Sequence, residues 1–139
     1  MIYLVDDAVD FRFLIQQVFN LFLPQYPVRF FTDGADLMQH IEAFPAEGGD
    51  AKPKLIVLDV DMPLLNGIET LERLKQRPDW QTIPVVMMTN RDAHEYMQDC
   101  YELGANAFLL KPLDLNTLKG LMTLLCQFWI ELNQLPKRP

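Results

Sequence analysis

The sequence is poor in the residues on which thiol chemistry and zinc sites depend. Its 139 residues include two cysteines, Cys100 and Cys126, and two histidines, His40 and His94. The cysteines lack the spacing of a metal site, and we expect them to be reduced and packed as small apolar side chains. Each histidine is alone on a predicted helix, where we expect a solvated side chain without a catalytic role. The sequence therefore favours neither a cysteine-based metal site nor a structural disulfide.

Basic residues and long apolar runs are also scarce. The chain has 12 Lys and Arg against 19 Asp and Glu, a net charge of −7, which disfavours nucleic acid and anionic membranes as partners. No apolar run approaches the length of a membrane span. The first residues, MIYLVDD, contain neither a basic region nor a cleavage-site pattern. We therefore expect a cytoplasmic protein with no nucleic-acid or membrane partner.

Apolar residues are plentiful: they make up half of the chain, enough for one core in a single domain over residues 1–139. Short apolar strands alternate with amphipathic helices. We predict strands at 2–6, 28–32, 54–59, 83–89 and 107–110. We predict helices at 9–22, 33–44, 66–77 and 92–104, a fifth helix after Pro112, and an extended helix and tail over 127–139. Non-alternating strands joined by helices predict an α/β fold: a doubly wound, five-stranded parallel sheet, flavodoxin-like, with five helices.

Polar residues stand where the apolar strands end. The first strand leads to Asp6 and Asp7, the third to Asp59, the fourth to Thr89 and the fifth to Lys111. The carboxyl ends of parallel strands share one edge of the sheet, where ligands bind at the switch point of the strand order. If the order is 2-1-3-4-5, the first and third strands are neighbours at that point. The three carboxylates are then expected to converge.

Converging carboxylates require a compensating positive charge. Two unit charges about 4 Å apart repel by roughly 4 kcal/mol at an effective dielectric constant of about 20. Oxygen ligands without a nearby His or Cys select a hard cation, and Mg²⁺ is the natural candidate. A cation beside a hydroxyl (Thr89) and an ammonium (Lys111) would make a pocket for a phosphoryl group. Asp59 is the carboxylate placed to act as a nucleophile and form an aspartyl phosphate.

Four segments at these strand ends resemble the signatures of a known family. In chain order, LVDD, VLDVDMPLLNG, MMTN and GANAFLLKP look like those of the response-regulator receiver domain of two-component signalling. The resemblance covers essentially the whole chain. It implies a signalling protein that is not an enzyme, in which Asp59 accepts a phosphoryl group from a histidine kinase or a phosphotransfer protein.

The resemblance also implies roles for single residues. Mg²⁺ would be bound by the side chains of Asp7 and Asp59, by the backbone carbonyl of Asp61, and by Asp6 mainly through water. Thr89 and Lys111 would each bind a phosphoryl oxygen.

Further positions of the family's pattern have counterparts here. Phe108 falls at the position of the switch aromatic, which turns inward when Thr89 moves toward the phosphate. A cis peptide before Pro112 would direct Lys111 into the pocket, and Gly67 would serve the turn into the third helix. Asn90 departs from the pattern, which usually has a small residue there, and its larger side chain could narrow access to the phosphoryl group.

The last predicted helix carries more apolar residues than one buried face requires. Part of the excess, near Leu121, Leu124 and Phe128, suggests a partner surface. In receiver domains the fourth helix, fifth strand and fifth helix form the usual output face. The ending FWIELNQLP also resembles the tail of stand-alone receivers that serve phytochrome-type histidine kinases, some of which dimerise. This resemblance implies a second copy of the chain, in a homodimer, as one candidate partner.

Other interpretations of the same residues stay open. Asp6 and Asp7 could cap the first helix, and Asp59 could begin a turn. DVDMP is superficially similar to the motif of haloacid-dehalogenase-type phosphatases, which also form aspartyl phosphates, although their partner carboxylates follow the motif in the chain. A receiver-shaped scaffold that no longer uses phosphate is the third alternative.

Overall fold

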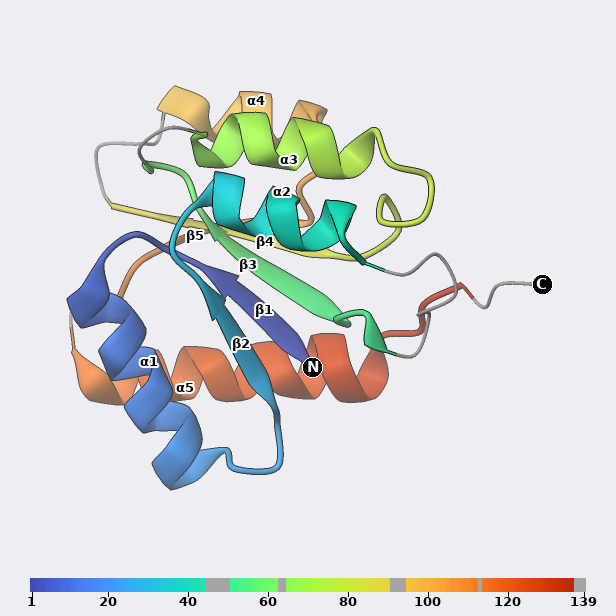
Figure 1. The fold of residues 1–139 in the computed structure, drawn as a ribbon. Coiled ribbons are helices and arrows are strands. Elements are labelled where there is room, and N and C mark those ends of the chain that lie inside the picture. The colour runs from blue at the N-terminus through green and yellow to red at the C-terminus, as the bar shows by residue number, and fades with distance from the viewer. Residues whose placement is uncertain (45–50, 63–64, 91–94, 113, 137–139) are drawn as a thin grey trace.

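The computed structural model describes the chain except residues 45–50, 63–64, 91–94, 113 and 137–139 (Figure 1). Five strands form one sheet: β1 (Ile2–Val5), β2 (Val28–Phe31), β3 (Leu55–Asp59), β4 (Val85–Thr89) and β5 (Ala107–Leu110). All four pairings are parallel, and the order is β2-β1-β3-β4-β5. The doubly wound, flavodoxin-like fold and its strand order are confirmed.

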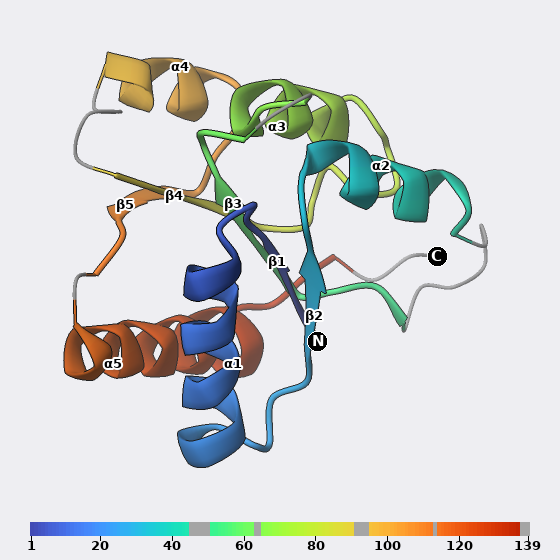
Figure 2. The same cartoon turned by 60° about the vertical axis from the view of Figure 1, so that its left-hand side comes forward.

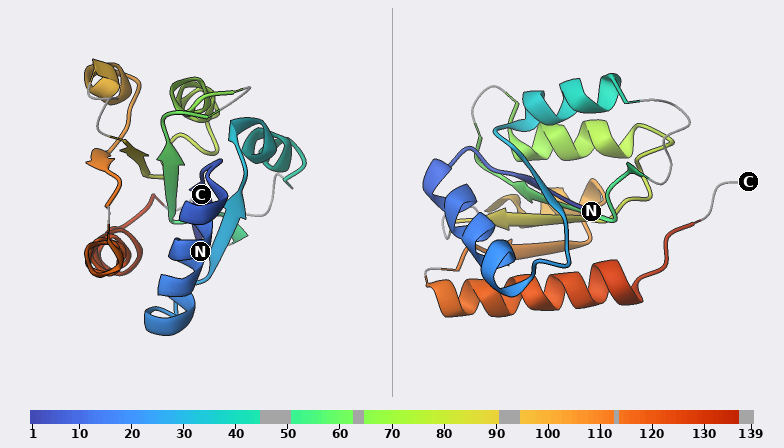
Figure 3. Two further views of the ribbon diagram at one scale, coloured as in Figure 1. Left: turned by 90° about the vertical axis from the view of Figure 1, so that its left-hand side faces the viewer. Right: turned by 60° about the horizontal axis from the view of Figure 1, so that its bottom comes forward.

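Helices cover both faces of this sheet. They are α1 (Val9–Phe22), α2 (Gly34–Glu42), α3 (Gly67–Lys75), α4 (Met97–Glu102) and α5 (Leu115–Leu125). In Figures 1 and 2, α1 and α5 lie on one face and α2, α3 and α4 on the other. The end-on view at the left of Figure 3 shows the same two layers. The last helix continues beyond α5 as a π-helical segment, η3 (Cys126–Leu132).

The two-sided cover explains the uninterrupted apolar strands. Along β1, Tyr3 and Val5 pack into the core beneath α2, α3 and α4, whereas Ile2 and Leu4 pack into the core beneath α1 and α5. Both kinds of position are buried, so neither face of the strand can be polar. The polar site residues of β3 and β4, Asp59 and Thr89, accordingly stand at the last position of each strand.

Helix caps fix the loops at the carboxyl edge of the sheet. Asp33 accepts a hydrogen bond from the backbone of Asp36 at the start of α2, and Asp114 accepts one from Thr117 at the start of α5. The N-cap of α1 is Ala8, which has no side-chain cap. The interpretation of Asp6 and Asp7 as the capping residues of α1 is therefore wrong.

Several expectations differ from the structure in detail. Helix α4 was predicted over 92–104 and begins at Met97, although part of the preceding segment lies outside the described residues. His40 was expected to be solvated; it is half-buried, and its Nε2 lies 2.9 Å from the hydroxyl of the buried Tyr3. His94 lies outside the described residues.

The cysteines agree with expectation, since Cys100 and Cys126 are buried and free. Within the described ranges, none of the helices combines the length and the apolar character needed to cross a bilayer.

Candidate functional site

Three carboxylates meet at the carboxyl edge of the sheet. Strands β1 and β3 are neighbours and pair Val5 with Leu58, so the next residue along each strand, Asp6 and Asp59, emerges at the same level. One carboxylate oxygen each from Asp6, Asp7 and Asp59 lie within 4.8 Å of one another. Asp6 is only 2% exposed and Asp59 only 3%, whereas Asp7 is exposed. The convergence predicted from the strand order is present.

Lys111 enters this cluster from the end of β5. Its Nζ lies 2.8 Å from Asp6 Oδ2 and 3.4 Å from Asp59 Oδ1. Its backbone N–H donates to the carbonyl of Thr89 at 2.8 Å, which extends the pairing of β4 with β5 by one residue. Burial lowers the pKa of Lys111, but its hydrogen bonds and ion pairs with Asp6 and Asp59 outweigh burial, so the pKa is raised overall. The lysine is therefore charged at neutral pH.

The peptide bond after Lys111 differs from expectation. No cis peptide bond occurs among the described residues, which include both Lys111 and Pro112, so the predicted cis bond is wrong. The contacts of Lys111 show that its ammonium reaches Asp6 and Asp59 with a trans bond.

The electrostatic balance of the site remains negative. Burial, followed by the charge of Asp6, raises the pKa of Asp59 from 3.8 to about 7, and Lys111 opposes this only in part. Among the described residues, Lys111 is the cation that pairs with these carboxylates, whereas Arg12 donates to the backbone carbonyl of Asp6. Oxygen donors crowded in this way, with a deficit of positive charge, fit a hard divalent cation.

A hydroxyl without a partner completes the buried part of the site. Thr89 ends β4, the strand next to β3, and is fully buried. Its Oγ1 has no hydrogen-bond partner in the described part of the chain. An unpaired buried hydroxyl costs free energy, so this atom has capacity to donate to a ligand oxygen. On the neighbouring strand β5, Phe108 is 9% exposed and is part of the core.

The turn between β3 and α3 passes very close to Asp59. A Cβ atom at Gly67 would lie 2.0 Å from the carbonyl oxygen of Asp59, so only glycine fits there. The backbone N–H of Gly67 donates to the carbonyl of Val60 at 2.9 Å, and a capping box between Asn66 and Glu69 starts the helix. The expectation that Gly67 serves this turn agrees with the geometry.

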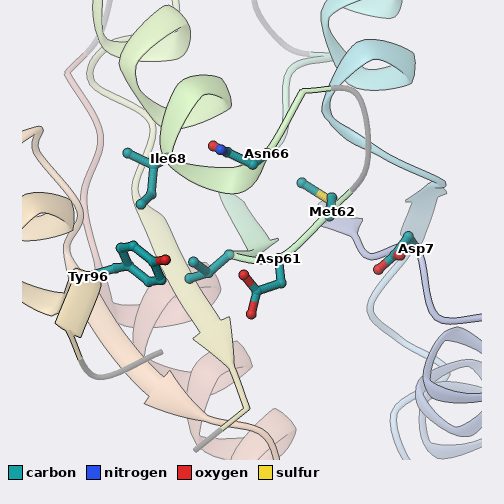
Figure 4. A pocket seen from close by; sticks show the side chains of 7 residues that line it. Asp7, Asp61, Met62, Asn66, Ile68 and Tyr96 are labelled. Atoms are coloured by element: carbon teal, nitrogen blue, oxygen red, sulfur yellow. The ribbon is translucent and has the colours of Figure 1, made fainter. Parts of the chain in front are cut away.

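An open pocket of about 420 Å³ lies beside the carboxylates. Figure 4 shows Asp7 and Tyr96 at opposite ends of this pocket, with Asp61 between them and the hydroxyl of Tyr96 on the side of Asp61. The side chain of Asp61 is exposed and is not part of the three-carboxylate cluster. The role of its backbone carbonyl as a metal ligand stays a prediction from the resemblance. Asn90 is exposed next to Thr89.

Sequence reasoning missed two aromatic residues at the site. Phe11 has the spacing of the core face of α1, yet its ring lies under the ammonium of Lys111, 4.8 Å from the ring centre. Tyr96 precedes α4 and lines the pocket, although no motif contains it. The one feature of the sequence that could have placed Phe11 at the site is its position in the first helical turn after Asp6 and Asp7.

Comparison with known proteins agrees with this geometry. Residues 2–123 match the response regulator receiver domain, and the chain belongs to this family. Receiver domains are generally non-enzymatic signalling proteins of two-component phosphorelays; they bind a divalent metal and take phosphate from histidine kinases.

Particular relatives match over almost the entire chain. Response regulator Rcp1 of Synechocystis sp. is 30% identical over 136 residues, which span 98% of this chain and 92% of Rcp1. The crystal structure of Mn²⁺-bound Rcp1 has a TM-score of 0.81 at 30% identity and covers 98% of both chains. That of RcpA, a phosphorylated cyanobacterial phytochrome response regulator, has a TM-score of 0.83 at 28% identity and covers 98% of this chain and 97% of RcpA.

Proposed function

We propose that this chain is a phosphoacceptor response regulator in which Asp59 receives a phosphoryl group from a histidine kinase or a phosphotransfer protein. The observation that carries the proposal is the joint position of Asp59, Lys111 and the unpaired hydroxyl of Thr89 at one edge of the sheet. The phosphoryl group then lies where positive charge and a hydrogen-bond donor are already in place.

The transfer uses the carboxylate of Asp59 as the nucleophile. One of its oxygens attacks phosphorus, the bond between phosphorus and the donor histidine nitrogen breaks, and the imidazole leaves with the electron pair. Lys111 binds one phosphoryl oxygen and the hydroxyl of Thr89 donates to another. Because the pKa of Asp59 is about 7 without a cation, positive charge near it increases the fraction of nucleophilic carboxylate.

The metal of this site is proposed to be Mg²⁺. The side chains of Asp7 and Asp59 and the backbone carbonyl of Asp61 would hold it, with Asp6 acting mainly through water. When bound, Mg²⁺ supplies the positive charge that offsets both the crowded carboxylates and the phosphoryl oxygens.

The structural change that phosphorylation causes is proposed to be transmitted to partner proteins through Thr89 and Phe108. Thr89 Oγ1 moves to the phosphoryl group, and Phe108, already largely buried, is held inward beside it. Phe108 has no hydroxyl, so packing alone carries this switch.

The output surface is proposed to be α4, β5 and α5. Each exposes large apolar side chains: Tyr101 on α4, Leu110 on β5 and Leu124 on α5, followed by Phe128 and Leu132 in η3. Residues 127–136, the described part of the continuation predicted over 127–139, would enlarge this surface of the single receiver domain. A second copy of the chain is one candidate partner, and the likeness to RcpA supports a phytochrome-type kinase as the donor. The cytoplasm, where such kinases expose their phosphohistidine, is the proposed location.

Stoichiometric labelling tests the proposal. Incubation with Mg²⁺ and a small acyl-phosphate donor should add the mass of one phosphoryl group, and Asp59→Asn should abolish the addition. Asp99→Asn, which changes an exposed acid on α4, is the matched control and should label normally.

The same experiment separates the alternative functions. Equal labelling of Asp59→Asn would contradict the assignment of the acceptor. Sustained turnover of a generic phosphate ester would instead favour the phosphatase, and an unlabelled wild-type protein would favour the scaffold.

A further inference from the structure

The first turn of α1 forms one wall of the acidic site. The backbone N–H of Ala8 donates to Asp6 Oδ1 at 2.9 Å, and Arg12 donates to the carbonyl of Asp6 at 2.6 Å. Phe11, from the same turn, places its ring 4.8 Å from the Nζ of Lys111, which itself donates to Asp6 Oδ2. Asp6 and Lys111 are thus held by α1 as one unit.

We propose that Phe11 is a positioning residue whose aromatic face holds the ammonium of Lys111 over the phosphoacceptor site. The inference rests on the proposed function of Asp59 and Lys111. Phe11 is neither one of the acidic residues nor a residue at a strand end. Its ring is proposed to increase the rate of phosphoryl transfer.

The surroundings of Lys111 make the ring face effective. A cation within about 6 Å of a ring centre is attracted by the negative face of the ring, more strongly when the pair is shielded from water. The side chain of Lys111 is only 11% exposed and Phe11 is half-buried, so little water screens this pair. Lysine has a flexible four-carbon stem, and the ring limits where its ammonium can lie.

The position of the ammonium matters because it has more than one partner. Asp6 is nearer to Nζ than Asp59 is, 2.8 Å against 3.4 Å. Asp6 alone could draw the lysine away from Asp59. The ring of Phe11 provides a further point of attraction, which restricts the positions open to an ammonium that already contacts both carboxylates before the phosphoryl group arrives. Preorganised charge of this kind lowers the barrier to transfer, because it need not be rearranged in the transition state.

A double-mutant cycle on labelling by a small acyl phosphate tests the proposal. Phe11→Leu keeps an apolar side chain but removes the ring, and should lower the rate constant about threefold to tenfold. Phe11→Tyr retains the ring and should stay within about twofold of the wild type. In the Lys111→Met background, which lacks the ammonium, Phe11→Leu should have almost no further effect.

Helix α1 provides a matched control. Phe22 lies on the same helix, and the Nζ of Lys119 is 4.0 Å from its ring centre, but this pair takes no part in the site. Phe22→Leu, like Phe11→Leu, removes an aromatic ring of α1 that contacts a lysine. This variant should be labelled at the wild-type rate. Urea unfolding of every variant checks that the fold is retained.

The outcomes separate this inference from the proposed function. Equal effects of Phe11→Leu with and without Lys111 would show ordinary packing and overturn the inference, as would a wild-type rate in Phe11→Leu. Labelling that persists in Asp59→Asn would overturn the proposed function instead. If Phe11→Leu is too unstable to assay, ring-fluorinated phenylalanine at this position weakens the negative face at nearly constant shape. The rate should then fall as fluorine atoms are added, and a constant rate would contradict the proposal.

Discussion

Lys111 donates to the carboxylate of Asp6 at 2.8 Å, although strands β1 and β5, which these residues follow, are separated in the sheet by β3 and β4. The side chain of Lys111 therefore crosses the carboxyl edge above two strands. This contact ties the outer strand β5 to the centre of the acidic site, and it also brings the ammonium to Asp59.

Removing this ammonium should destabilise the metal-free protein. Lys111→Met leaves two buried carboxylates without their cation, and we expect the free energy of unfolding to fall by about 1–3 kcal/mol. Urea unfolding in EDTA measures the change. Lys119→Met, at an exposed lysine of α5 that makes a cation–π contact with Phe22, should cost no more than about 1 kcal/mol. Equal losses in both variants would show that the ion pairs of Lys111 contribute nothing specific.

Lys111 should also link phosphorylation to output. Lys111→Ala is expected to permit some labelling of Asp59, because the nucleophile and the acidic cluster remain. Labelling of this variant should no longer change its affinity for a partner protein. Titration of the partner with labelled and with unlabelled Lys111→Ala compares the two dissociation constants. Normal coupling in this variant would argue against the proposed role of Lys111.

The stability of the metal-free protein should fall as pH rises from about 4 to about 7. The pKa of Asp59 is raised from 3.8 to about 7, so the unfolded chain releases this proton at a lower pH than the folded protein does. Below pH 4 both the folded and the unfolded state hold the proton, and Asp59 does not reduce stability. Above pH 7 both states have released it, and the buried carboxylate lowers the free energy of unfolding by roughly 2–4 kcal/mol.

Replacing Asp59 should remove this pH dependence. In EDTA, Asp59→Asn should unfold at higher urea than the wild type near neutral pH and at similar urea near pH 4. Asp99→Asn, at an exposed site, should follow the wild-type curve. A constant difference between Asp59→Asn and the wild type across this range would contradict the raised pKa.

The turn at Gly67 should tolerate no side chain. A Cβ atom there would lie 2.0 Å from the carbonyl oxygen of Asp59, so Gly67→Ala must displace the backbone of the proposed acceptor. We expect a loss of at least about 2 kcal/mol in stability, together with slower labelling.

Gly120 provides the opposite control. It lies within α5, and a Cβ atom there would meet nothing within 4 Å. Gly120→Ala should therefore stabilise the helix by about 0.5–1 kcal/mol. A harmless Gly67→Ala would show that the loop can move away from Asp59 without cost.

The strands could be predicted from the sequence because burial on both faces leaves a simple signature. Their order was that of flavodoxin-like doubly wound sheets. Residues 107–110 are β5 as predicted, and the other strands begin or end within two residues of prediction. The meeting of Asp6, Asp7 and Asp59 followed from the same reasoning, since parallel strands of a known order fix which ends are neighbours. Backbone topology thus determined most of the candidate site.

Side-chain partners from distant elements could not be predicted in this way. Phe11 has the spacing of a core residue, and only the three-dimensional structure shows that its ring lies under Lys111. His40 looked like a surface histidine, because its partner Tyr3 lies 37 positions away in the chain. The cis bond before Pro112 that the family's pattern implies is likewise absent among the described residues.

The most direct test of the central claim is to locate the phosphoryl group after transfer from a phosphorylated histidine donor in the presence of Mg²⁺. Reduction of the acyl phosphate with borohydride, followed by peptide mapping, marks the modified carboxylate. We predict a single modified residue, Asp59, and no modification when Mg²⁺ is replaced by EDTA. Modification of Asp6, Asp7 or Asp61 instead, or equal modification of Asp59 in EDTA, would contradict the account.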